Sequence, residues 1–124
     1  MHDRFAINFT DGFSRDHPRF RQLLQAFKEA ETRDKPEGRT MQRDAVDEFI
    51  RDGVEVAIGK AREDKPTLVM SGDDDRVVPV DNSHKLATLI RGSRLCVLPN
   101  AGHMFWEEKM PETAATVSAF LSAK

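Results

Sequence analysis

The residues best suited to chemistry in this sequence are an aspartate and a histidine, each placed just after a short apolar run. Asp75 lies in the segment Gly72–Pro79, and His103 lies in Asn100–Trp106. A carboxylate beside an imidazole fixes the tautomer of the ring and stabilises the imidazolium that forms when the ring accepts a proton. The two residues would therefore form an acid–base pair, and that pair requires a nucleophile.

Two predicted strands and one predicted helix would position this pair. The run Thr67–Met70 lies between Pro66 and Gly72, which predicts a buried strand at 67–71, and Arg94–Leu98 predicts a second one. Apolar positions between them predict a helix from Pro79 that ends before Gly92. Asp75 and His103 are 28 positions apart, close to the roughly 30 residues of one strand–helix–strand unit. We expect both side chains at the same edge of neighbouring parallel strands.

Apolar residues at helical spacing predict three further helices. These cover residues 18–31, residues 41–51 and the chain from Pro111 onward, with loops at 32–40 and 99–110. The apolar stretch Val54–Ile58 is too short for its periodicity to separate a helix from a strand, and we favour a helix. The order of elements from residue 65 is therefore strand, helix, strand, helix, which predicts an α/β fold.

Two segments resemble the acid and histidine segments of α/β-hydrolases, namely Pro66–Pro79 and Leu98–His103. In that family the acid stands three residues after the glycine, which selects Asp75, and the histidine follows an Ala-Gly pair, which selects His103. The neighbouring Asp73 and Asp74 are then interpreted as turn formers, and Asp74 is also a candidate helix cap. The resemblance implies that residues 65–124 form a βαβα unit and that residues 1–64 form a helical, lid-like region.

The nucleophile of this family is missing from the sequence. Family members carry a Gly-x-Ser-x-Gly elbow and a glycine-rich oxyanion loop upstream of the lid, and neither occurs here. The segment Gly12–Ser14 has no second glycine and no apolar strand before it. We expect a catalytic triad that is present only as Asp75 and His103.

Two functions remain open on this evidence. In the first, Asp75 orients His103, which acts as general base for a serine on another chain that attacks a small-molecule ester, lactone or related carbon-centred bond. In the second, the protein is a non-catalytic, truncated hydrolase homologue with an oligomeric binding or structural role. Whether the isolated chain is an enzyme is therefore open.

The predicted sheet is too small to be stable alone. The expected architecture is a partial α/β-hydrolase fold, helix-rich with a small and mainly parallel sheet, and the strand at 67–71 would expose an apolar edge. We expect this edge to be covered in a homodimer, or by a separate chain that carries the nucleophile half.

Composition argues against several other classes. The net charge of −2 is spread along the chain without a block of like charges, so no nucleic-acid surface is expected. No apolar run approaches the roughly 20 residues of a membrane span. The one cysteine, Cys96, is expected inside a buried strand, and with no apolar leader at the start a cytoplasmic location is the default expectation. No cofactor or metal site is predicted, because the Asp73–Asp75 run lacks the alternating ligands of a calcium loop.

Other residues allow alternative interpretations. Met104, Phe105 and Trp106 would line an acyl pocket or close the core. The phenylalanines at every fourth position near the start would form a helix face that caps a pocket, or a surface for a partner; they are Phe5, Phe9 and Phe13. The remaining histidines are expected at the surface; they are His2, His17 and His84.

Overall fold

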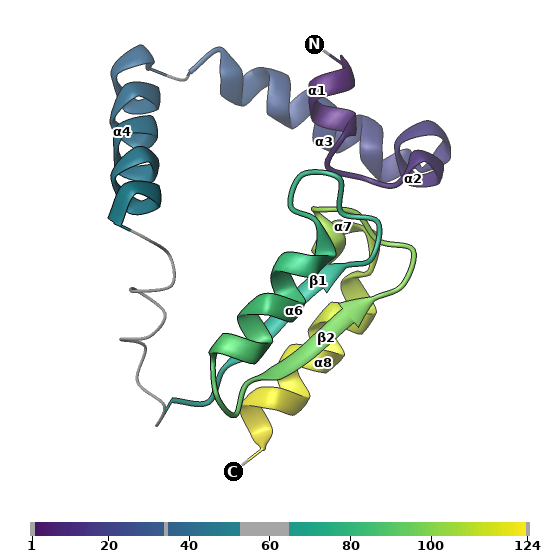
Figure 1. Cartoon of the computed structure of the whole chain (residues 1–124). Coiled ribbons are helices and arrows are strands. Elements are labelled where there is room, and N and C mark those ends of the chain that lie inside the picture. Colours follow the sequence, from purple (N-terminus) through teal and green to yellow (C-terminus); the bar gives the residue numbers. More distant parts are fainter. Residues whose placement is uncertain (1, 34, 53–64, 124) are drawn as a thin grey trace.

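The computed structural model describes residues 2–33, 35–52 and 65–123. Within these ranges, four helices precede the first strand, one helix lies between the two strands, and two helices follow the second strand (Figure 1). The first four helices are α1 (His2–Ala6), α2 (Asp11–Asp16), α3 (Pro18–Glu31) and α4 (Pro36–Asp52). The later elements are β1 (Leu68–Gly72), α6 (Val80–Leu89), β2 (Arg94–Leu98), α7 (Phe105–Glu108) and α8 (Met110–Ser122).

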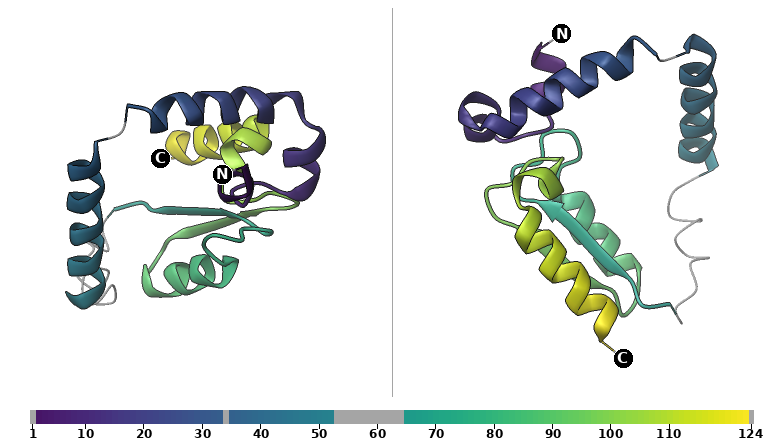
Figure 2. Two further views of the ribbon diagram at one scale, coloured as in Figure 1. Left: turned by 90° about the horizontal axis from the view of Figure 1, so that it is seen from above. Right: turned by 180° about the vertical axis from the view of Figure 1, so that it is seen from behind.

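The two strands form a parallel sheet with a helix on each face. The register pairs Leu68 with Arg94 and Gly72 with Leu98. Helix α6 covers one face of the sheet and α8 covers the other, as the view from above shows (Figure 2). On the α8 side, the Arg94 guanidinium lies 5.9 Å from the centre of the Phe120 ring. The right-handed crossover through α6 brings the carboxyl ends of both strands to one edge.

The core of the N-terminal part is a cluster of phenylalanine rings. Phe9 is fully buried, and the rings of Phe5 and Phe13 lie 5.3 and 5.1 Å from its ring. Phe20 on α3 meets Phe9 edge to face at 5.4 Å. These phenylalanines do not form a surface for a partner, because α1 and α2 are two short helices that turn the rings inward against α3.

The first strand is Leu68–Gly72, where 67–71 was expected, and helices form in two of the expected loops. Helix α4 begins at Pro36, inside the expected 32–40 loop, because proline is well suited to the first turn of a helix and Gly38 near the start weakens it only modestly. Helix α7 forms inside the expected 99–110 loop, where the Met104 carbonyl accepts the Glu107 N–H at 2.9 Å. The expected element at 54–58 lies outside the described residues.

The expected α/β character is confirmed in its coarser form, as a helix-rich chain with a small parallel sheet. Helix α4 lies at the far end of α3, away from the sheet (Figures 1 and 2). Met41 and Val46 on this helix are 72% and 50% exposed, so these two side chains pack little apolar surface in this chain. Within the described ranges, no helix combines the length and the apolar character that a membrane span requires.

Candidate active site

The loops that follow β1 and β2 are joined to each other by backbone hydrogen bonds. The Asp73 N–H donates to the Leu98 carbonyl, and the Asp74 N–H donates to the Ala101 carbonyl, both at 3.0 Å. Gly72 makes this close approach sterically feasible, because a Cβ atom there would lie 2.0 Å from the Ala101 carbonyl oxygen. The parallel ladder thus continues past the strands and holds the two chemistry-bearing loops side by side.

Asp75 and His103 meet across these loops. Asp75 Oδ2 lies 2.8 Å from His103 Nδ1. The other carboxylate oxygen, Oδ1, accepts the backbone N–H groups of Val77 and Val78 at 2.9 and 2.8 Å. The Asp75 side chain is only 5% exposed, whereas the His103 side chain is 34% exposed. The expectation that the two side chains lie together at one sheet edge is therefore met.

This geometry defines what the ring can do. A carboxylate facing Nδ1 favours the tautomer that carries its proton on Nδ1, and Nε2 then has a free lone pair. Among the described residues, Nε2 has no hydrogen-bond partner, and the ring is partly open to solvent. The pair is therefore arranged to accept a proton at Nε2 from a group that approaches from outside.

The N-terminal segment between α1 and α2 braces the histidine loop. The Met104 N–H donates to the Asn8 carbonyl at 2.8 Å. Gly102 packs so closely against this segment that a Cβ atom there would lie 2.8 Å from the Asn8 carbonyl oxygen and from the Phe9 Cα. The Glu108 carboxylate also accepts hydrogen bonds from Thr10 and from Gly102.

Arg76 connects the acid loop to the same segment. Its Nη1 lies 2.9 Å from Asp11 Oδ1, and its Nη2 donates to the Phe9 carbonyl. Neither Arg76 nor Glu108 was recognised in the sequence as a functional residue. Their partners lie 65 and 98 positions away, so no local pattern reveals them.

The other candidate residues lie outside the pair. Asp73 and Asp74 are exposed, and Asp73 Oδ1 accepts the Ala101 N–H at 3.4 Å, as a residue that shapes a turn does. His17 and His84 are exposed, and His17 caps the start of α3 by accepting the Arg19 N–H. Within the described ranges, no group of three His, Cys, Asp or Glu side chains is placed to hold a metal ion.

The three residues that follow His103 pack in two different places. Met104 packs against the phenylalanine cluster and closes the core. Trp106 is 43% exposed, and its ring meets the His103 ring edge to face at 6.5 Å. Phe105 contacts the Trp106 ring at 5.2 Å. Trp106 is therefore a partly exposed aromatic ring beside the His103 ring.

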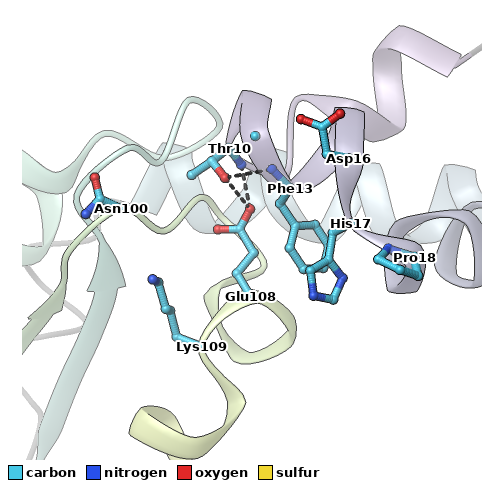
Figure 3. A pocket seen from close by; sticks show the side chains of 9 residues that line it. Thr10, Phe13, Asp16, His17, Pro18, Asn100, Glu108 and Lys109 are labelled. Atoms are coloured by element: carbon cyan, nitrogen blue, oxygen red, sulfur yellow. Dashed lines mark hydrogen bonds between the residues drawn. The ribbon is translucent and has the colours of Figure 1, made fainter.

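Two open hollows lie beside the pair without including it. One, of about 360 Å³, is lined in part by Thr10, His17, Glu108 and Lys109 (Figure 3). The other, of about 500 Å³, is lined in part by Asp11, Asp73 and Asp74. His103 lines neither hollow. The pair therefore lies outside both hollows.

In the described part of the chain, neither Ser14 nor Cys96 contacts His103. Ser14 lies inside helix α2, and its hydroxyl donates to the Asp11 carbonyl at 3.2 Å, so it is not on a strand-to-helix elbow. Cys96 is only partly buried, and its sulfur lies 4.0 Å from the Thr116 hydroxyl on α8. No described serine, threonine or cysteine forms a hydrogen bond with His103.

Comparison with known proteins assigns the family. The sequence model of the α/β hydrolase fold matches residues 1–109. The chain belongs to the α/β-hydrolase family. This α/β-hydrolase chain is 51% identical over 41 residues to a non-heme haloperoxidase of Rhodococcus erythropolis, a match over 32% of the chain and 15% of the relative. It is 39% identical over 59 residues to the 2-hydroxy-6-oxo-6-(2'-aminophenyl)hexa-2,4-dienoic acid hydrolase of Metapseudomonas resinovorans, over 48% of the chain and 20% of that relative.

Two solved structures have the same fold as this α/β-hydrolase chain. A serine hydrolase involved in carbazole degradation superposes with a TM-score of 0.68 at 26% identity, covering 100% of the chain and 48% of that structure. An esterase from Exiguobacterium antarcticum superposes with a TM-score of 0.65 at 28% identity, covering 97% of the chain and 41% of that structure. The chain thus spans less than half the length of both structures.

Proposed function

We propose that this chain supplies the acid–base half of an α/β-hydrolase site, in which Asp75 orients His103 and His103 removes the proton of a serine on another polypeptide segment. The observation that supports this role most strongly is the 2.8 Å contact between Asp75 Oδ2 and His103 Nδ1, with Nε2 left free. The two backbone N–H bonds to Asp75 Oδ1 hold the carboxylate in position, so the ring is oriented before a nucleophile arrives.

The proposed reaction is hydrolysis of an ester, a lactone or a related carbon-centred bond. The serine oxygen attacks the carbonyl carbon as its proton passes to His103 Nε2, and the imidazolium then donates this proton to the leaving group. Water then attacks the acyl–serine carbonyl carbon as its proton passes to His103 Nε2. The acyl–oxygen bond to the serine breaks, the imidazolium returns the proton to the serine oxygen, and the acid product leaves. The esterase and the carbon–carbon hydrolase among the similar proteins support this reaction class.

The free edge of β1 supports the need for a second polypeptide. Within the described residues, β1 pairs only with β2, and its other edge pairs with no strand. An unpaired edge of this kind accepts a strand from another chain. We propose that this edge is covered in a homodimer, or by a segment that carries the nucleophile half.

A hydrolysis assay tests the proposal. Release of p-nitrophenol from a short-chain p-nitrophenyl ester is measured for the chain alone and after mixing with an α/β-hydrolase fragment that carries Gly-x-Ser-x-Gly and ends ahead of its lid. Light scattering records the mass in each case. Activity of the mixture that disappears with His103→Ala supports the role of His103. Equal activity of the mixture with the wild-type chain and with His103→Ala contradicts it.

The alternative function is that of a non-catalytic oligomer. The free β1 edge and the missing nucleophile favour this alternative over other classes of protein. A stable homodimer by light scattering that stays inactive in the mixture would support this alternative.

A further inference from the structure

Glu108 is the last residue of α7, and its carboxylate turns back toward the residue that precedes His103. Oε2 accepts the Gly102 N–H at 2.7 Å. Oε1 accepts the Thr10 N–H at 2.6 Å and the Thr10 hydroxyl at 3.0 Å. Figure 3 shows the carboxylate of Glu108 directed at Thr10. One side chain thus joins the histidine loop to a segment 98 positions away.

Among the described residues, the carboxylate of Glu108 takes part in hydrogen bonds and not in an ion pair. Its side chain is half-buried, and no Lys, Arg or His in the described part of the chain forms an ion pair with it. A carboxylate is a stronger acceptor than a neutral group, so three donors on one carboxylate fix its position firmly. The neighbouring Glu107 differs, because it forms an ion pair with Arg19, whose side chain is 45% exposed.

The residues on both sides of His103 are hydrogen-bonded, directly or through Glu108, to the segment between α1 and α2. The Gly102 N–H is bound by Glu108, which is anchored on Thr10, and the Met104 N–H is bound by the Asn8 carbonyl. Glycine has the widest backbone freedom of any residue, so without a partner for its N–H the residue before His103 would sample several conformations. These two bonds hold the backbone on either side of His103.

We propose that Glu108 is a positioning residue that holds His103 in line with Asp75 by clamping Gly102 to Thr10. This inference rests on the proposed role of His103 as the base. Glu108 does not contact the reacting atoms in this arrangement. In an assembled site, its loss would lower kcat and leave KM nearly unchanged, because substrate contacts are preserved while fewer molecules hold the ring in the productive direction.

The tautomer of His103 tests the clamp without any need for activity. Long-range ¹⁵N–¹H NMR spectra of the full chain, recorded at a pH where the ring is neutral, give the ratio of the Nδ1–H to the Nε2–H form. In Glu108→Gln, the amide offers only one acceptor oxygen and turns an NH₂ group toward a donor. We expect the ratio to fall by about tenfold, equivalent to about 1.4 kcal/mol. Glu107→Gln is the matched control, and its ratio should equal that of the wild type.

An unchanged ratio in a folded Glu108→Gln variant would overturn the proposal. If this variant does not fold, Thr10→Val and Thr10→Ser replace it, because valine removes the hydroxyl donor to Glu108 and serine keeps it. A lowered ratio in Thr10→Val alone supports the clamp, and equal ratios in both overturn it. This test is independent of the proposed function. If Glu108 determines the tautomer of His103 but the assembled protein is inactive, the positioning role is supported and only the proposed function is refuted.

Discussion

Asp75 uses both of its carboxylate oxygens, Oδ2 for His103 Nδ1 at 2.8 Å and Oδ1 for the N–H groups of Val77 and Val78. The acid is thus tied to its own loop before it orients the ring. Because this carboxylate is 5% exposed, water competes little for the contact. This arrangement predicts that the charge of the Asp75 carboxylate, more than its size, determines which tautomer His103 adopts.

Asp75→Asn tests that dependence in the assembled site. The amide is isosteric with the carboxylate, but it can present its NH₂ group to Nδ1 and so favour the wrong tautomer. We expect kcat for p-nitrophenyl ester hydrolysis to fall by about 10⁴-fold, the size of effect known for this change in a serine protease triad. Asp74→Asn is the control, because Asp74 is exposed and outside the pair; its kcat should stay within about twofold. Similar losses in both variants would contradict the assignment of Asp75.

Gly72→Ala tests the close approach of the two loops. The added Cβ would lie 2.0 Å from the Ala101 carbonyl oxygen, so the backbone must move. We expect the free energy of unfolding in urea to fall by about 1–3 kcal/mol or more. Gly12→Ala places the new Cβ more than 4 Å from any heavy atom outside its own stretch of helix, and because Gly12 lies in α2 it should leave the stability unchanged or raise it by up to about 1 kcal/mol. Equal stability of the two variants would show that the loops are not packed as described.

Phe9→Ala tests the phenylalanine cluster. Phe9 is fully buried and contacts the rings of Phe5, Phe13 and Phe20. Its removal leaves a cavity, and we expect a loss of about 3–5 kcal/mol in the free energy of unfolding. Met41→Ala, at a side chain that is 72% exposed, should change it by less than about 0.5 kcal/mol. A small effect of Phe9→Ala, measured by the same urea titration, would argue against a packed N-terminal core.

The sequence allowed the acid–histidine pair to be predicted, because it depends on local signals. A short apolar run marks each strand, ended by Gly72 in the first and by Pro99-Asn100 in the second. Parallel strands joined by one helix then bring their carboxyl ends together. The strand at Arg94–Leu98 and the helix at Pro18–Glu31 have the expected bounds for the same reason. The catalytic role of Asp75 and His103, and the division of the chain near residue 65, stay predictions.

The parts that could not be predicted depend on contacts between distant segments. The spacing of Phe5, Phe9 and Phe13 suggested a single helix face, but the chain bends between α1 and α2, and the rings turn inward onto α3. Glu108 lies in a segment without helical periodicity, and its partner Thr10 lies near the start of the chain. Only the folded arrangement shows that these residues brace the histidine loop.

We propose that His103, oriented by Asp75, activates a serine supplied by another polypeptide segment. The decisive measurement is the rate at which a fluorophosphonate probe labels that serine in the assembled mixture, because labelling needs an activated serine and no particular substrate. We expect His103→Ala to slow labelling by about 10³-fold or more, while the assembled mass by light scattering is unchanged. Equal labelling rates for the wild type and His103→Ala would contradict this role of His103.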